Sequence, residues 1–222
     1  PHLPVAALLH YGRTVGDRLR RHRGIPGLLC TSTGTILSTM PHIPIGITGW
    51  GSVSPLGHDR RQVWAHYGRP QTAIVRREDG VLVAPLAGAA AGAIEELKGQ
   101  DKRYQALDRS VLMAMTAASQ ACRVAGWTRH QDFGINIGSS RGATERWETH
   151  HRSLLYGSPD RLSPLASPTT TLGNIASWVA QYLETDGPAI SHSITCSTAL
   201  HALLNGVSWL EAKRGEFGKD PS

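Results

Sequence analysis

The fold is decided most clearly by residues 189–210, which read AISHSITCSTALHALLNGVSWL. The first six, 189–194, predict a short strand, and the rest predicts a long helix that runs through Leu210. Cys196 lies at the junction, where unpaired N–H groups and the positive end of a helix dipole stabilise a thiolate over a thiol. Because the predicted helix is apolar on nearly every side, we expect it to be central and buried, with the Cys196 thiol at the bottom of a pocket.

Two interpretations of Cys196 stay open on this pattern alone. A free cysteine is often simply a small buried hydrophobe that fills space in a core. A cysteine between a strand and a helix can instead be a catalytic nucleophile, because the thiolate is the reactive form.

From Met40 onwards, predicted strands and helices alternate along the chain. The clearest helix runs from Asp108, a suitable N-terminal cap, to Ala125, with Gly126 as its C-terminal stop. This alternation predicts an α/β fold in which helices cover a largely parallel sheet. The other predicted strands are 43–47, 81–83 and 133–138, the other helices are 60–67 and 174–184, and a Gly/Ala-rich turn and a proline-containing loop are expected after residue 83 and at 159–168.

Residues 1–39 differ from the rest of the chain. They carry five arginines against the single acid Asp17 and show no sustained period of a helix or a strand. An arginine-rich, acid-poor leader is typical of a transit peptide. The simpler interpretation starts from Met40, which stands just before the first convincing strand. We expect 1–39 to be untranslated upstream sequence or a start-site error outside the fold, followed by a domain over 40–217 and a tail over 218–222.

The composition excludes several classes of protein. With 222 residues, 40% hydrophobic and 18% charged, the chain is an ordinary globular protein, and it holds no apolar run long enough for a membrane span. The net charge of +6 lies mostly in 1–39, and no basic stripe interleaved with aromatics follows, so we expect no nucleic-acid partner. Cys30, Cys122 and Cys196 form neither a disulfide framework nor a zinc motif, which favours a reduced, cytoplasmic protein.

Five short motifs, taken together and in order, resemble the N-terminal half of the β-ketoacyl-acyl-carrier-protein synthases, the condensing enzymes of the thiolase fold. Each motif is weak alone, but together they surround Cys196 in the order of the family, from about residue 43 to 217. The resemblance implies a thiolase-like three-layer α/β/α fold, of which only the N-terminal half is present. The motifs are ITGWGSVSPLG at 47–57, LDR at 107–109, IGS at 137–139, the Ser-Pro pairs at 163–164 and 167–168, and Gly-Pro at 187–188.

What the resemblance implies for function is decarboxylative Claisen condensation, in fatty-acid, polyketide or aryl-polyene-type synthesis. Cys196 would take an acyl group from acyl carrier protein as a thioester, with its own backbone N–H as one oxyanion donor. Malonyl-carrier protein would then lose carbon dioxide and attack that thioester. The two histidines and the lysine that the family uses for this step lie in its C-terminal half, so we expect the chain alone to be inactive in condensation.

The resemblance implies no cofactor and two kinds of partner. The first is acyl carrier protein, and the second is another synthase subunit, in a homodimer or in a heterodimer with a related synthase. The alternative function is that of a chain-length factor, a non-catalytic partner that resembles synthases but lacks the nucleophilic cysteine. The presence of Cys196 argues against this alternative.

Two residues are assigned to the substrate pocket by the same resemblance, Arg141 and Ala166. The family usually has an apolar residue at the place of Arg141, and a buried, unpaired guanidinium is very costly. An arginine that enters the pocket therefore argues against long saturated acyl chains. Alternatively, Arg141 turns outward and pairs with Glu145 at i+4. The sequence leaves both orientations open.

The histidines near the predicted site match no role in the family. His192 precedes Cys196 by four residues, and His201 follows it by about one helical turn, so we expect both to be structural or to line the pocket. His150 and His151 are expected in a loop, without nearby ligands at metal-binding spacing, so no metal site is predicted.

Overall fold

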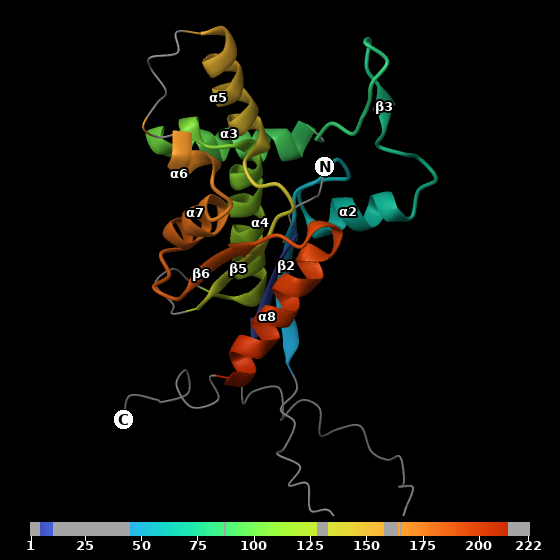
Figure 1. Ribbon diagram of the computed structural model, residues 1–222. Coiled ribbons are helices and arrows are strands. Elements are labelled where there is room, and N and C mark those ends of the chain that lie inside the picture. Colours follow the sequence, from blue (N-terminus) through green and yellow to red (C-terminus); the bar gives the residue numbers. More distant parts are fainter. Residues whose placement is uncertain are drawn as a thin grey trace, which may run out of the picture.

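The structure is a computed structural model that describes residues 5–10, 45–86, 88–127, 133–157, 164 and 166–212 (Figure 1). The strands are β1 (Val5–His10), β2 (Gly46–Ser52), β3 (Val75–Arg76), β4 (Leu82–Val83), β5 (Ile135–Gly138) and β6 (Ala189–His192). The helices are α2 (Arg60–Tyr67), α3 (Gly88–Gln100), α4 (Arg109–Ala125), α5 (Thr144–Tyr156), α6 (Ala166–Thr170), α7 (Asn174–Leu183) and α8 (Thr198–Ala212). Two 3₁₀ turns are η1 (Lys102–Ala106) and η2 (Thr195–Ser197).

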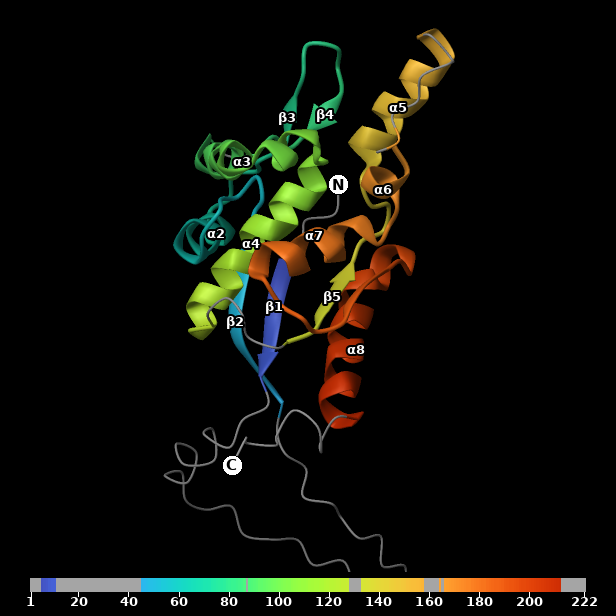
Figure 2. The ribbon, with the colours of Figure 1, turned by 90° about the vertical axis from the view of Figure 1, so that its left-hand side faces the viewer.

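Helices cover the strands from both sides, as expected. Figure 2 shows α4 and α7 on one side of β1, β2 and β5, with α8 on the other. The contacts agree, because α4 packs on β1 and β2, α7 packs on β5 and β6, and α8 packs on β5. The three-layer α/β/α arrangement predicted from the alternating sequence is therefore confirmed.

The sheet is less parallel than the sequence predicts. Among the described strands, β5 and β6 form a parallel pair, with Ile135 opposite Ala189 and Gly138 opposite His192. The pairs β1–β2 and β3–β4 are antiparallel. A parallel pair needs a long crossover, and the segment with α5, α6 and α7 provides one between β5 and β6.

Part of the leader belongs to the sheet. Residues Val5–His10 form β1, which pairs antiparallel with β2 so that Val5 lies opposite Ser52 and His10 opposite Gly46. The expectation that all of 1–39 stands outside the fold is therefore wrong for these six residues. The physical reason is that a strand edge presents unpaired N–H and C=O groups, which another strand satisfies. The rest of 1–39 and the predicted tail at 218–222 lie outside the described residues.

Helix α4 is the centre of the core, and its predicted ends are confirmed. The Asp108 side chain caps its start by accepting from the Ser110 N–H, and Gly126 ends it in a left-handed conformation at φ 74°. The side chains of Val111 and Met115 are fully buried. A Cβ at Gly51 of β2 would lie 2.2 Å from the Ala117 carbonyl oxygen, so α4 packs directly against the backbone of that strand.

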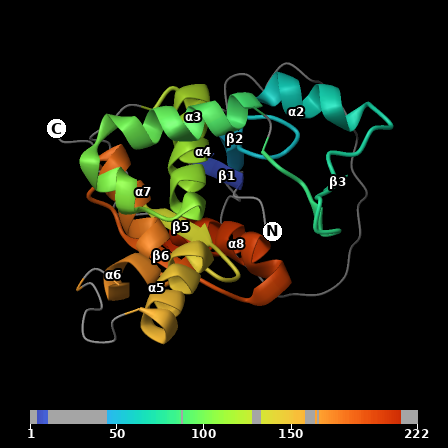
Figure 3. The same ribbon diagram turned by 90° about the horizontal axis from the view of Figure 1, so that it is seen from above.

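Three helices are not predicted from the sequence, and one of them, α6, begins where a proline-containing loop is expected. The Gly/Ala-rich segment after β4 forms helix α3 and not a turn, because alanine favours helix and Ala90, Ile94 and Leu97 bury one face. Helix α5 buries no residue, and the few large apolar side chains that it carries, Trp147, Leu154 and Leu155, are too sparse to predict a helix. It projects from the same end of the molecule as the β3–β4 hairpin (Figure 2), and the view onto that end shows the two well apart (Figure 3). Within the described ranges, no helix has both the length and the apolar character needed to cross a bilayer.

Candidate active site

Strand β6 delivers Cys196 to the start of α8. The strand ends at His192, the turn η2 spans Thr195–Ser197, and α8 begins at Thr198. The predicted strand-to-helix junction at Cys196 is therefore confirmed. The Cys196 side chain, however, is exposed, so the expectation of a thiol at the bottom of a pocket is wrong in this structure.

The exposure of Cys196 follows from how α8 packs. One side of the helix lies on β5: a Cβ at Gly138 would be 2.5 Å from the Thr198 carbonyl oxygen, and a Cβ at Gly134 would be 2.8 Å from the Trp209 ring. Thr198 is the one residue of α8 that is buried. Leu200 and Leu204 are 65% and 60% exposed, because no described element covers the other side of the helix. The prediction of a fully buried α8 is therefore wrong for the described chain.

The backbone of the turn over residues 194–197, called the nucleophile turn below after the role expected for Cys196, is strained. Thr195, directly before Cys196, has φ 48°, in the left-handed region that β-branched residues rarely adopt. Such a conformation persists only where neighbouring contacts hold it, and strained residues of this kind gather at functional sites. No sequence pattern signals this strain, because threonine is not a turn residue of the left-handed type.

Thr198 supplies the contacts that hold this turn. Its hydroxyl donates to the Thr195 carbonyl oxygen at 2.5 Å and accepts from the Ile194 N–H at 2.9 Å. The Ser197 N–H donates to the Ile194 carbonyl oxygen at 3.3 Å. Because Thr198 is buried and its hydroxyl bonds back to the two residues before Cys196, it fixes the direction in which the thiol leaves the turn. Sequence reasoning missed this residue, although a threonine two residues after the cysteine is a plausible cap for the helix.

The turn after β5 lies against the nucleophile turn. The Ser139 N–H donates to the His192 carbonyl oxygen at 3.2 Å, and the Ser193 hydroxyl donates to the Ser140 carbonyl oxygen at 3.0 Å. Gly138 admits the backbone of α8 because it has no side chain. The predicted glycine-serine turn and the predicted nucleophile segment are thus brought together, although they are far apart in the sequence.

Arg141 follows this turn and is exposed. It lines an open hollow of about 290 Å³ together with Thr144, Trp147 and Thr170. Glu145 forms its ion pair with Arg109, at 3.5 Å, and the described residues provide no ion pair for Arg141. The alternative in which Arg141 pairs with Glu145 is therefore wrong.

Ala166 is the first residue of α6 and is half-buried. Its carbonyl oxygen accepts from the Thr170 hydroxyl at 2.6 Å, and Thr170 lines the same hollow as Arg141. The structure thus brings the two predicted pocket residues to one side of the molecule through α6. Trp147, which sequence reasoning did not single out, forms a wall of the hollow and stacks on His151 at a ring distance of 5.2 Å.

The other candidate side chains have structural surroundings. The His201 ring nitrogen Nδ1 lies 3.0 Å from the Ser197 carbonyl oxygen. His150 and His151 lie in helix α5, not in the loop that was expected. Within the ranges that the structure describes, no group of three His, Cys, Asp or Glu side chains could hold a metal ion.

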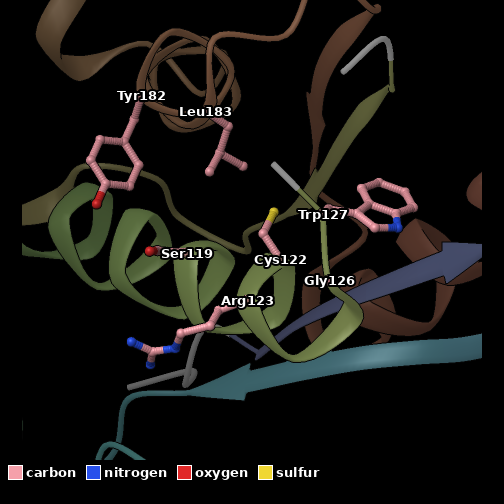
Figure 4. A pocket seen from close by; sticks show the side chains of 7 residues that line it. All are labelled: Ser119, Cys122, Arg123, Gly126, Trp127, Tyr182 and Leu183. Carbon is pink, nitrogen blue, oxygen red and sulfur yellow. The ribbon is translucent and has the colours of Figure 1, made fainter. Parts of the chain in front are cut away.

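The second described thiol, Cys122, differs from Cys196 in its position and in its burial. It lies near the end of α4 and is buried, and burial raises the pKa of its thiol, which keeps it in the unreactive protonated form. Figure 4 shows the Cys122 sulfur pointing from α4 toward Leu183 of α7. Cys122 lines a second hollow, of about 480 Å³, which is separate from the Arg141 hollow. The residues around it are Ser119, Cys122, Arg123, Gly126, Trp127, Tyr182 and Leu183.

Asp108 is a further residue whose full role the sequence did not reveal. Its carboxylate accepts from the Ser110 N–H at 2.8 Å and the Ser110 hydroxyl at 2.6 Å, and also from the Arg146 N–H at 3.0 Å in the first turn of α5. The Arg146 side chain in turn donates to the carbonyl oxygens of Gln105 and Leu107. Asp108 therefore fastens the start of α5, and with it the Arg141 hollow, to the core helix.

The family of the chain is now clear. The family model for the N-terminal domain of β-ketoacyl synthases matches residues 43–216. The chain belongs to the β-ketoacyl synthase family and carries its N-terminal domain, with the thiolase-like fold.

Curated relatives agree with this family. A 3-oxoacyl-[acyl-carrier-protein] synthase 2 from Vibrio cholerae is 28% identical over 162 residues, which are 70% of this chain and 39% of that protein. Nodulation protein E from Rhizobium meliloti is 26% identical over 77% of this chain and 44% of its own length. The chain thus spans less than half the length of these relatives.

Solved structures show the same fold. A β-ketoacyl synthase from Burkholderia phymatum matches with a TM-score of 0.63 at 21% identity, over 74% of this chain and 43% of that one. The ishigamide ketosynthase/chain length factor matches with a TM-score of 0.58 at 18% identity, over 75% and 43% of the two chains.

Proposed function

We propose that this chain supplies the nucleophile of a β-ketoacyl-acyl-carrier-protein synthase, and that Cys196 accepts the acyl group. The observation that supports this most is the nucleophile turn itself: an exposed thiol follows a strained residue, and the buried Thr198 holds the turn at the start of a helix. A structural cysteine needs neither exposure nor a strained neighbour. The segment Ser-His-Ser-Ile-Thr-Cys also lies within residues 43–216, the range that the family model matches.

The acyl transfer follows from this geometry. The Cys196 thiolate attacks the carbonyl carbon of an acyl thioester on carrier protein, and the oxyanion that forms accepts from the Cys196 backbone N–H. The carbon–sulfur bond to the phosphopantetheine arm then breaks, and its thiolate leaves with a proton from solvent. The products are an acyl thioester on Cys196 and a free carrier thiol.

Condensation is the second step of the proposal, and it belongs to the whole enzyme. Malonyl-carrier protein loses carbon dioxide, and the resulting carbanion equivalent attacks the acyl thioester, which releases the Cys196 thiolate and a β-ketoacyl-carrier protein. The groups that assist this decarboxylation in the family come from its C-terminal half. We therefore expect residues 1–222 alone to accept an acyl group without condensing it. Release of carbon dioxide together with a ketoacyl product by the isolated chain would contradict this.

Arg141 and Ala166 are the proposed acyl-pocket residues. A guanidinium in the Arg141 hollow disfavours a long saturated chain there, because an unpaired charge is costly to cover with hydrocarbon. Replacing Arg141 by isoleucine should therefore shift self-acylation toward longer acyl groups, measured as the mass of the Cys196 adduct with carrier-bound acyl groups of increasing length. Arg152→Ile is the matched control, because Arg152 lies on α5 outside the lining of the hollow. An unchanged chain-length profile for Arg141→Ile would reject the pocket role.

The proposal includes a dimer and a cytoplasmic setting. The apolar side chains that α8 exposes support a further subunit or domain against this helix, and a catalytic thiol needs the reduced conditions of the cytoplasm. The second candidate function is that of a chain-length factor, which is favoured by the structural likeness to a ketosynthase/chain length factor. Cys196 favours the catalytic subunit over this alternative.

The experiment that tests the nucleophile is iodoacetamide labelling of the folded chain, followed by peptide mapping. Cys196 should be labelled well before Cys122, because Cys122 is buried and its pKa is raised. Incubation with acyl-carrier protein should then add one acyl group, which Cys196→Ser abolishes and Cys122→Ser leaves in place. Preferential labelling of Cys122, or acylation that survives Cys196→Ser, would refute the assignment.

A further inference from the structure

Two polar side chains are buried between the β5–β6 pair and α8 without hydrogen-bond partners. The two residues are Asn136 and His192. Among the described residues, no hydrogen-bond partner is found for the Asn136 atoms Nδ2 and Oδ1 or for the two ring nitrogens of His192. A buried polar group without a hydrogen bond destabilises the fold, because it has lost its water partners and gained none. Two such groups close together in one small domain therefore call for an explanation.

Both side chains lie on the same face of the strand pair. Asn136 is opposite Ile190 and Gly138 is opposite His192, and residues opposite each other in a pair share a face. The face is the one toward α8, because a Cβ at Gly138 would meet the Thr198 carbonyl oxygen. The neighbouring residue Ser191 points the other way, where its hydroxyl accepts from the Ala176 N–H of α7 at 3.2 Å.

The two side chains are diagonal neighbours across the strands. His192 has Gly138 directly opposite, which offers no side chain, and Asn136 is the next residue of β5 on that face. Neighbouring strands lie about 4.8 Å apart and alternate residues of a parallel strand about 6.6 Å apart, so two diagonal side chains on one face can approach the same water molecule. An amide and a neutral imidazole are also complementary, because each carries both a donor and an acceptor.

We propose that Asn136 and His192 are linked through one bound water molecule that hydrogen-bonds to both side chains, and that they act as a pair that positions Cys196. This proposal rests on the proposed role of Cys196 as nucleophile. His192 is the last residue of β6, and its carbonyl oxygen already accepts from the Ser139 N–H. A side-chain link to Asn136 adds a second tie at the same point, so that the end of β6 cannot rotate and the turn to Thr195 starts from one direction.

The pair is tested by a double-mutant cycle with Asn136→Leu and His192→Phe, which remove the polar groups at similar size. Each single variant leaves one buried polar group alone, so Cys196 labelling by iodoacetamide should slow about three- to tenfold, as expected for the loss of one net hydrogen bond. The double variant should regain the wild-type rate to within about twofold, because two apolar groups can replace a bonded pair. Ile137→Val, on the opposite face of β5, is the control and should leave the rate unchanged. Rates that fall independently in the two single variants, or do not fall at all, overturn the proposal.

A second measurement does not depend on the variants folding. In the wild-type chain, nuclear Overhauser effects should connect the His192 ring protons with the side-chain amide protons of Asn136, and their absence would overturn the pair. The two proposals fail separately. Preferential labelling of Cys122 in the wild-type chain refutes the nucleophile, whereas these proton contacts report on the pair alone.

Discussion

Helices α4 and α8 are similar in length and both rich in apolar residues, yet the protein uses them in opposite ways. Helix α4 spans 17 residues and buries nine of them between β2, α3 and α7. Helix α8 spans 15 residues and buries Thr198 alone, at the end that touches Gly138. The apolar residues of α4 gather on one broad face, while those of α8 surround the helix.

The difference shows that the distribution of apolar residues around a helix indicates how many of its sides are covered. A one-sided apolar helix needs one layer to cover it, and the strands and α7 provide that layer for α4. A helix that is apolar all round needs cover on every side, and β5 covers only one side of α8. The all-round apolar sequence of α8 therefore predicts more cover for this helix than the described residues provide. This is consistent with a chain that spans less than half the length of these relatives.

The largest contrast is expected between a core side chain of α4 and an exposed side chain of α8. Met115→Ala should lower the free energy of unfolding by about 3 kcal/mol, because it removes a fully buried side chain from α4 and leaves a cavity. Leu204→Ala on α8 should cost less than about 0.5 kcal/mol, since that side chain is mostly exposed. Urea unfolding of both variants measures the difference. Equal losses of unfolding free energy in the two variants would contradict the difference in burial between α4 and α8.

The cap of α4 should matter next. Asp108→Ala should cost about 2–3 kcal/mol, because the buried carboxylate accepts from N–H groups at the starts of both α4 and α5. Asp59→Ala is the matched control. That residue caps α2 alone, through the Arg61 and Gln62 N–H groups, and should cost about 1 kcal/mol. A loss for Asp108→Ala no larger than the control would show that α5 is not fastened through this residue.

The start of α8 offers a smaller test with a functional readout. Thr198→Val keeps the shape of the side chain but removes both hydrogen bonds to the nucleophile turn, and should cost about 1 kcal/mol while slowing Cys196 alkylation. Thr198→Ser retains the hydroxyl and should restore the alkylation rate. If the valine variant reacts as fast as wild type, the turn is held by something other than Thr198.

The smallest effect on stability is expected on the uncovered side of α8. Leu200→Lys should change the free energy of unfolding by no more than about 0.5 kcal/mol, because the side chain is exposed. The same change should weaken the dimer proposed above, which analytical ultracentrifugation would show as a shift toward monomer relative to the unchanged chain. Undiminished association would mean that another surface holds the copies together.

Local signals predicted local features well. The N-cap Asp108 and the stop Gly126 define α4 in the sequence as they do in the structure, and the junction at Cys196 was placed from a strand pattern followed by a helix pattern. The sequence does not predict helix α5, because a helix that buries no side chain needs no periodic apolar face. The hydrogen bond from the Arg146 N–H to Asp108 is not predicted either, because the sequence does not show that α5 lies beside Asp108.

The remaining errors concern partners in space. Strand β1 was assigned to a leader outside the fold, since six residues in a region without period carry no signal of the strand edge that they pair with. The exposure of Cys196 was misjudged because burial depends on what covers α8, not on the composition of α8. Strain at Thr195 is likewise set by Thr198 and Ile194 and not by the threonine itself.

The parallel pairing of β5 with β6 also bears on the order in which the chain assembles. Residues 139–188 separate the two strands, so their pairing closes a long loop, whereas α4 forms through contacts within one short segment. Closing a long loop costs entropy before the contacts repay it, and nonlocal pairing slows folding. We therefore expect the core helix α4 to acquire protection from hydrogen exchange early in refolding and strand β6, which leads to the turn at Cys196, to acquire it last. Pulse-labelling of the α4 and β6 amides would show this order, and simultaneous protection of both would contradict it.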